Sequence, residues 1–355
     1  MESRGVPVHK GFFVPDVRAM ELAWWEERKC STGFIQLSGQ EGVSEARVTE
    51  IKPGETLPPY KMAIDEVVYV VSGRGVTSVW SDEAPTPRSF EWQDHALFVV
   101  PHNQYRQFGN MQGDKPVRLL HYSYLPLAMS VVPDPDFFLN NPYSPSGNEY
   151  THRQDFYSEA KVISGGQGLR WRDSGGERAY WYGNFFPDMR AWDKLNVNTH
   201  RGAGGKTVTI QFAGSDMSCH MSVFAHATYK KAHRHGPGRV IIIPGGEGYS
   251  VMWQEGQEKV MVPWQEAALF VPPNKWFHQH FNLGPTHARY LALHPPMQFH
   301  GYAEKVEDQA KDQIEYVNED AWVREHFEEE LAKRGLKSLM PVEAYKNPSY
   351  EWKPN

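Results

Sequence analysis

Short apolar runs separated by turn residues dominate the hydrophobic pattern of this sequence. Runs rich in β-branched and aromatic residues occupy positions 66–71, 96–100 and 240–243, and turns containing glycine or proline follow at 72–75 and 244–248. Runs of this length between turn signals predict β-strands. Many short strands with such turns are typical of a sandwich or a barrel, so we expect an all-β protein.

Two segments depart from this pattern. The segment 134–147 is rich in Pro, Asn and Ser, which predicts a long loop or linker. Residues 318–335 instead have a helical pattern, with Asn318 or Asp320 as the N-cap and Gly335 as the residue that ends the helix. The charges of this helix indicate a solvent-exposed face, so we expect a helical tail without chemistry of its own.

Three blocks of the sequence occur twice, in the same order. The block at 12–19 returns at 185–191 and the block at 92–99 returns at 264–271, with a shorter matched pair between them. The tryptophans that open the later block lie 172 positions apart (264 − 92). Matches at a nearly constant offset indicate that the chain contains two copies of one structural unit.

In the first copy, five residues are spaced like a known barrel motif. Gly54, Tyr60, Met62, Glu66 and Gly73 are separated by five, one, three and six residues. This arrangement resembles the first motif of the cupin family, in which a His-x-His pair and then a glutamate bind a metal. Tyrosine and methionine replace both histidines here, so the resemblance implies that the first copy has lost its metal motif.

The second cupin motif is matched in both copies, with intervals of five, four and three residues. The two matching sets are His95, Pro101, Arg106 and Asn110, and Ala267, Pro273, His278 and Asn282. The histidine that binds metal in the family falls on Arg106 in the first copy and on His278 in the second. A cationic Arg106 would repel a metal ion, whereas His278 keeps the ligand.

The second copy also retains the His-x-His pair, as His233 and His235, while Arg239 stands where the family has its glutamate. Residues i and i+2 of a strand point to the same side, so both histidines can face a barrel interior. Trp276, His278 and further alternate residues share one face by the same rule. The resemblance therefore implies one divalent transition metal on His233, His235 and His278.

The resemblance also implies the architecture, two tandem cupin barrels of the double-stranded β-helix or jelly-roll type. We predict an N-terminal barrel at 1–165, a metal-binding C-terminal barrel at 166–305 and a helical tail at 306–355.

The set of three histidines without a carboxylate resembles the non-heme iron centres of certain cupin dioxygenases. This favours Fe(II) and a dioxygenase that acts on a small organic acid, phenol or diketone-like substrate. Imidazole ligands do not select one metal, so Mn, Ni, Zn and Cu stay open. Two alternatives also stay open: a redox-neutral metal-dependent lyase, isomerase or decarboxylase, and a non-catalytic ligand-binding bicupin.

Three further residues are candidates for substrate binding or catalysis. Arg239 is either a surface residue or a clamp for a substrate carboxylate, since guanidinium binds carboxylates bidentately. His280 has four possible roles: a fourth ligand, a neighbour of the ligands, an acid/base group or a packing residue. Trp276 is the better pocket candidate among the tryptophans, because Trp253 and Trp264 have counterparts in the first copy.

Composition narrows the possible partners. The 355-residue chain has a net charge of -6 and no basic stripe, so we expect no nucleic-acid partner. No signal peptide or membrane-length apolar stretch is evident, and the two cysteines, Cys30 and Cys219, do not suggest disulfides. We expect a cytoplasmic protein with a small-molecule substrate that forms a homo-oligomer if its edge strands pair.

Overall fold

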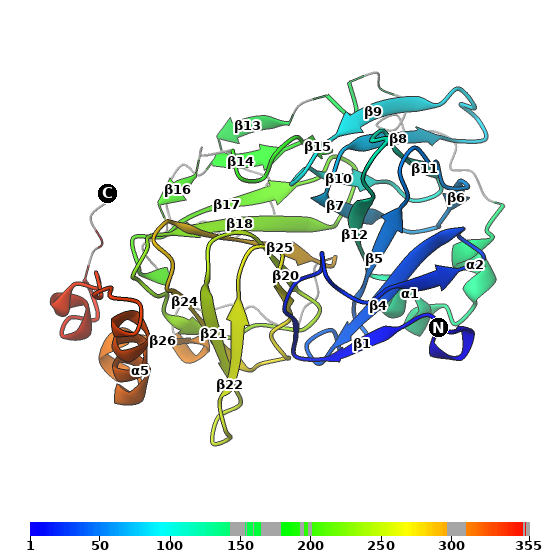
Figure 1. The fold of residues 1–355 in the computed structure, drawn as a ribbon. Helices are drawn as coiled ribbons and strands as arrows, with labels where there is room; N and C mark the ends of the chain where they lie inside the picture. Colours follow the sequence, from blue (N-terminus) through cyan, green and yellow to red (C-terminus); the bar gives the residue numbers. More distant parts are fainter. Residues whose placement is uncertain are drawn as a thin grey trace.

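Figure 1 shows a computed structural model of the protein, in which β-strands make up most of the regular structure. The structure describes residues 1–142, 153, 155–158, 160–164, 179–191, 195–197, 201–296, 310–350 and 352. The described strands form one large and one small sheet for each half of the chain. The prediction of an all-β fold is confirmed.

The first half of the chain builds an eight-stranded and a four-stranded sheet. Their strands are β1 (Val8–Gly11), β3 (Ala23–Trp25), β4 (Cys30–Leu37), β5 (Glu45–Ile51), β6 (Tyr60–Lys61), β7 (Glu66–Ser72), β8 (Gly75–Trp80), β9 (Arg88–Trp92), β10 (Leu97–Val100), β11 (Tyr105–Asn110), β12 (Val117–Ser123) and β15 (Phe185–Phe186). The large sheet has the order β1-β4-β5-β12-β7-β10-β15, with β3 beside β4, and the small sheet has the order β6-β11-β8-β9.

The second half repeats this plan with a nine-stranded and a five-stranded sheet. Their strands are β2 (Phe13–Val14), β13 (Lys161–Ser164), β14 (Ala179–Tyr182), β16 (Asn196–Val197), β17 (Lys206–Gln211), β18 (Ser218–Phe224), β19 (Ala232–His233), β20 (Val240–Gly245), β21 (Gly248–Trp253), β22 (Val260–Trp264), β23 (Leu269–Phe270), β24 (Phe277–Asn282), β25 (Ala288–His294) and β26 (Gln313–Ile314). The orders are β13-β14-β17-β18-β25-β20-β23-β2, with β16 beside β17, and β22-β21-β24-β19-β26.

Each half lends one short strand to the other. β2 pairs with β23 of the second half, and β15 pairs with β10 of the first half. The backbone N–H of Val17 donates to Ala267 (2.9 Å), and that of Met189 donates in the same way to His95 (2.9 Å). The duplicated sequence blocks therefore form the two short strands that the barrels exchange, and this exchange holds the two halves together. The predicted limits at 165 and 305 lie outside the described residues.

The central strands of both large sheets are apolar on both faces. In β7, Val67 and Tyr69 join an apolar cluster shared by the two halves, whereas Val68 and Val70 face the interior of the first barrel. β20 is divided in the same way, with Val240 in the shared cluster and Ile241 inside the second barrel. Burial on both sides explains why these strands appear in the sequence as continuous apolar runs.

Two short helices lie where the sequence suggested only irregular structure. α1 (Leu125–Val131) and α2 (Pro135–Leu139) cover an apolar cluster around Met62. The prediction of a continuous loop over 134–147 is wrong for the start of that segment. There the Asp134 carboxylate accepts the Asp136 backbone N–H (3.0 Å) and Pro135 occupies the first helical position, two features that favour a helix start.

The helical tail is confirmed as α5 (Ala321–Ala332), capped by Asp320, whose carboxylate accepts the backbone N–H of Trp322 (3.1 Å). Gly335 follows with a φ of 70°, the left-handed conformation that suits glycine after a helix. The tail also contributes β26, which pairs with β19 of the second barrel, so the C-terminal segment is part of the barrel wall. The remaining short helices of the described residues are 3-10 turns at Glu2–Arg4, Ala310–Asp312, Tyr316–Asn318 and Val342–Tyr345.

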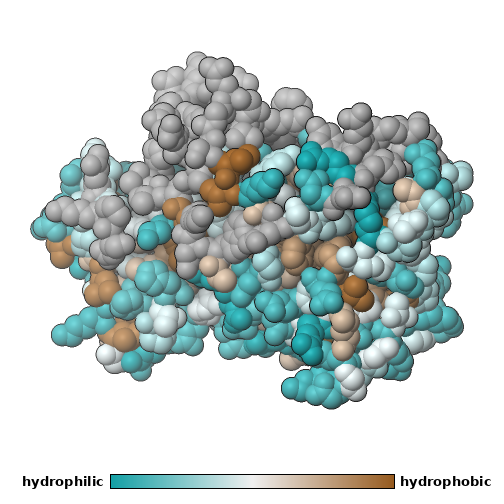
Figure 2. Space-filling view, turned by 90° about the horizontal axis from the view of Figure 1, so that it is seen from above, coloured by the Kyte–Doolittle hydropathy of each residue, from teal (hydrophilic) through white to brown (hydrophobic). Residues whose placement is uncertain are grey.

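The surface of the protein has both polar and apolar regions. Figure 2 shows hydrophilic residues interspersed with separate apolar patches on the face seen from above. Exposed large apolar side chains include Val131, Phe137 and Leu139 on α1 and α2. Among the described residues, no helix combines the length and the apolar character that crossing a membrane requires.

Candidate metal centre

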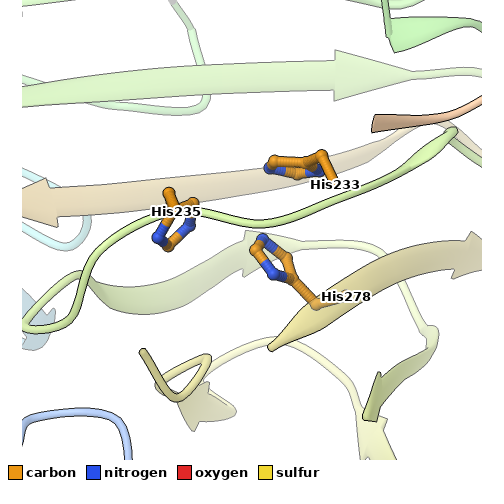
Figure 3. Close-up of side chains that lie close together, drawn as sticks. All are labelled: His233, His235 and His278. Atoms are coloured by element: carbon orange, nitrogen blue, oxygen red, sulfur yellow. The ribbon is translucent and has the colours of Figure 1, made fainter. Parts of the chain in front are cut away.

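The three predicted histidine ligands converge inside the second barrel (Figure 3). His233 lies in β19 and is paired in register with His278 in β24, and His235 lies two residues beyond the end of β19. One nitrogen atom of each ring lies within 4.8 Å of those of the other two. The side chains are buried, with exposed fractions of 8%, 6% and 0% for His233, His235 and His278. Two antiparallel strands thus bring residues 45 positions apart (278 − 233) to one point.

Backbone carbonyl groups orient two of these rings. His235 Nδ1 lies 2.7 Å from the carbonyl oxygen of Gly236, and His278 Nδ1 lies 3.3 Å from that of Trp276. A carbonyl only accepts, so each Nδ1 carries the proton and each Nε2 keeps a lone pair. Among the described residues, the buried His278 Nε2 and His233 Nδ1 have no hydrogen-bond partner. A histidine that donates one ring N–H to a carbonyl and offers its other nitrogen is typical of a metal ligand.

The environment keeps all three rings neutral. Burial lowers the pKa of His233 and His235 well below the ordinary value, and it lowers the pKa of His278 to about 3. The guanidinium groups of Arg201, near His233 and His278, and of Arg239, near His235, lower these pKa values further. Neutral imidazole is the form that binds metal ions. The donor set therefore fits a divalent transition metal at neutral pH.

Three cationic side chains lie near the histidines, with Arg201 and Arg239 close to the ligands and Lys230 close to His280. Arg239 is half-buried directly before β20, and burial followed by repulsion from Arg201 lowers its pKa to about 10. Lys230 is 1% exposed; its ammonium group donates to the Ser222 hydroxyl, and burial, then Arg201, lowers its pKa to about 7. Arg239 therefore lies near the ligands and not on an open surface. A clamp for a substrate carboxylate needs such a position. Positive charge at these positions favours an anionic ligand.

Sequence reasoning missed Arg201 and Lys230. Lys230 lies three residues before the His-x-His pair, and its neighbour Lys231 carries the same charge, so a basic pair next to the motif was the available signal. Arg201 precedes a glycine-rich turn with no motif around it, and the tertiary fold alone brings it to the site. Its guanidinium donates to the side chain of Gln313 in β26 (3.3 Å), which links the tail to the site.

His280 lies on the same strand as His278 but is held differently. Its Nδ1 lies 2.7 Å from the Ser250 hydroxyl, which itself accepts the indole N–H of Trp264 (3.0 Å). A hydroxyl that accepts from an indole is free to donate its own proton to Nδ1, which favours the tautomer with the proton on Nε2. His280 is not in the group of converging ligand atoms. A hydrogen-bond donor to a bound ligand suits this geometry better than a fourth metal ligand.

The tryptophans have mainly structural contacts. Trp276 is half-buried and packs against Phe12 of the first half, with ring centroids 5.7 Å apart, while its carbonyl accepts from His278. A substrate contact by Trp276 stays a prediction. Trp264 donates to Ser250 just as Trp92 donates to Thr77 (2.8 Å) in the first barrel, which agrees with a structural role for that repeated residue.

In the first barrel, an ion-pair network occupies the matching positions. Glu66 is fully buried and accepts hydrogen bonds from Tyr60 (2.8 Å), from Arg106 (3.2 Å) and from Arg47. Met62, the other substituted ligand, faces the apolar cluster beneath α1 and α2. Across the described residues, the three histidines of the second barrel are the one group found with metal-ligand geometry. Arginine side chains thus neutralise the retained glutamate, as a metal does in the intact motif.

Comparison with known proteins defines the class of fold. No protein-family model matches this sequence, and a search of the curated proteins found no significant relative. Among solved structures, a Bacillus subtilis oxalate decarboxylase studied for its Mn(II) centres is 10% identical, with a TM-score of 0.51 over 98% of this chain and 88% of that chain. A single-residue variant of the same enzyme is 9% identical, with a TM-score of 0.50 over 83% and 80% of the two chains.

Such low identity demonstrates a shared fold and nothing finer. The architecture of two barrels that exchange short strands is the bicupin fold, as the sequence motifs predicted. This protein therefore has a bicupin fold, and its converging histidines lie in the C-terminal barrel.

Proposed function

We propose that this bicupin is a metal-dependent enzyme that removes carbon dioxide from a small carboxylate substrate in its C-terminal barrel. The observation that carries the proposal is the group of three buried, neutral histidines, two of them oriented by carbonyls, with Arg201 and Arg239 near the group and Lys230 near His280. A metal bound by these histidines would supply a Lewis acid that polarises a substrate oxygen. The similarity of the fold to an oxalate decarboxylase with Mn(II) centres supports the same class of chemistry.

The roles of the protein groups follow from their positions. The guanidinium groups of Arg239 and Arg201 would bind a substrate carboxylate and fix its orientation. In the reaction, a carbon–carbon bond breaks, carbon dioxide leaves, and the electron pair left on carbon takes up a proton. Lys230, whose pKa lies at about 7, and His280, with its proton on Nε2, are the candidate proton donors.

A second candidate is the Fe(II) dioxygenase suggested by the sequence. The specific observation in its favour is Arg239, which replaces the carboxylate ligand and leaves three neutral histidines. Both candidates use the same residues as ligands. They differ in whether dioxygen is consumed as a co-substrate.

A substrate panel distinguishes these functions. Protein loaded with Mn(II) or with Fe(II) would be incubated with small mono- and dicarboxylates, while carbon dioxide release and oxygen uptake are recorded together. The proposal expects carbon dioxide release without net oxygen uptake, and a 10-fold or greater loss of kcat/KM in Arg239→Gln. Oxygen uptake equal to product formation would establish the dioxygenase instead. No turnover with either metal would leave only a binding function and refute the proposal.

A further inference from the structure

The first barrel contains a cavity of its own, separate from the three histidines. Its volume is about 20 Å³, and it is lined by side chains of β3, β4, β5, β6, β11 and β12, by Arg28 before β4 and by the segment before β6. The polar lining groups that matter here are Arg28, Arg47, Tyr60 and His121. Since about 10–15 Å³ of such space holds one water molecule, the cavity has room for only a very small ligand.

Positive charge exceeds negative charge around this cavity. Arg47 donates to Glu45 (2.7 Å) and to Glu66, and Arg106 donates to Glu66 (3.2 Å). The positive charges of these two arginines and the negative charges of the two glutamates cancel. Within the described part of the chain, Arg28 forms no ion pair, so one positive charge remains uncompensated.

Arg28 is held in place by aromatic rings instead of by a carboxylate. Its guanidinium carbon lies 3.8 Å from the centroid of the Tyr60 ring and 5.6 Å from that of Trp25. Burial is the largest effect on its pKa, which is lowered, and attraction to Tyr60 and Glu66 offsets only part of that penalty. A guanidinium fixed by stacking at a cavity wall keeps its N–H donors available to a ligand.

His121 provides a second and independent sign of a missing ligand. The side chain lies in β12 at 2% exposure and lines the cavity. Its Nδ1 is 3.4 Å from a Glu66 oxygen, and neither ring nitrogen has a hydrogen-bond partner among the described residues. Burial lowers the pKa of His121 although Glu66 opposes this shift, so the ring is neutral, and neither its N–H nor its lone pair has a hydrogen bond of normal geometry. A buried polar group without a partner is rare in folded proteins.

We propose that the N-terminal barrel binds one small monovalent anion, no larger than nitrate or formate, between the Arg28 guanidinium and the His121 ring. One negative charge would balance the excess positive charge, and a planar oxyanion matches the guanidinium fork. The barrel that lost its metal motif thus becomes an anion site. The proposal does not depend on the function proposed for the second barrel.

Titration calorimetry of the full-length protein with sodium nitrate and sodium formate tests the proposal, in a buffer without other small anions and at constant ionic strength. We expect saturable binding of about one anion per chain, and much weaker binding of benzoate because the cavity is too small. Arg28→Met should weaken nitrate binding 10-fold or more, and Arg28→Lys should restore part of it. Arg74→Met, which alters an exposed arginine of the same barrel, should have no effect.

The metal centre is tested separately by His278→Ala, which should bind nitrate as tightly as the parent protein. Loss of binding in this variant would place the anion in the second barrel and overturn the proposal. Equal binding by Arg28→Met and the parent, with unchanged circular dichroism, would also overturn it. The absence of saturable binding by the parent protein up to about 50 mM nitrate or formate would overturn it as well.

Discussion

The docking of the C-terminal tail should depend on pH through Glu319. This half-buried carboxylate accepts the Tyr229 hydroxyl and the Gln279 amide (3.2 Å), and both residues belong to the second barrel. Burial raises the pKa of Glu319 from 4.5 to about 7. The folded protein therefore binds this proton more tightly than the unfolded chain does. The resulting stability is fully present below about pH 4.5 and is lost as the pH rises through 7.

The magnitude follows from the size of the shift. One pKa unit corresponds to about 1.4 kcal/mol, so a rise from 4.5 to about 7 amounts to about 3 kcal/mol when the carboxyl is fully ionised. Between pH 5 and pH 8, the free energy of tail opening should fall by about 2–3 kcal/mol. Glu319→Gln removes the titration, and its new amide can donate to Gln279 Oε1, which has no partner among the described atoms. The variant should therefore keep the low-pH stability at pH 8.

Hydrogen exchange of the α5 amides measures this opening directly, after correction for the intrinsic dependence of exchange on pH. Glu325→Gln, on the exposed side of the same helix, is the matched control and should behave as the parent protein. The opening free energy of Glu319→Gln should not change with pH in this range. If its pH slope equals that of the parent protein, the reasoning about Glu319 is refuted. Because Gln313 in β26 pairs with His233, the result also reports on the wall of the candidate site.

Two further substitutions test local interactions. Asp320→Ala removes the side-chain cap on the Trp322 N–H and should cost α5 about 1 kcal/mol, measured as faster amide exchange in its first turn; unchanged exchange would contradict the capping role. Ser250→Ala leaves Trp264 Nε1 and His280 Nδ1 without their shared partner and should destabilise the barrel by about 1–3 kcal/mol. Calorimetry checks this, and a melting temperature within 1 °C of the parent would contradict it.

The sequence predicted the fold well because both barrels need the same backbone geometry. The motif spacings that reflect this geometry therefore occur twice in the chain. The exchange of β2 and β15 was not predicted. Their residues, Phe13 and Phe186, look like ordinary strand residues, and only the assembled sheets reveal which half they join. α2 was missed because a five-residue helix has too few positions to show a helical period.

The candidate site was predicted in part. His233, His235 and His278 follow a motif, so their convergence was predictable from strand alternation. Arg201 was not predictable, because its proximity to the histidines comes from packing between distant segments. Lys230 was missed although the basic pair beside the His-x-His motif was a signal for it. Whether an arginine binds a substrate or pairs with a carboxylate also depends on the side chains around it.

The same dependence appears in the first barrel. There, Arg106 was predicted to repel a metal, and the structure adds that it pairs with the retained Glu66. That pairing required the positions of side chains from two strands, which no spacing in the sequence provides.

Metal content is the measurement that tests the central claim most directly. The parent protein, His278→Ala and the matched control His226→Ala, which removes a half-buried histidine of the same barrel outside the ligand group, would be purified without added metal. Each would then be reconstituted with Mn(II) or Fe(II), dialysed and analysed for elements. We expect about one metal ion per chain in the parent protein and the control, and a large loss in His278→Ala. Parent protein that holds no metal after reconstitution, or His278→Ala that holds as much as the parent, would contradict the account.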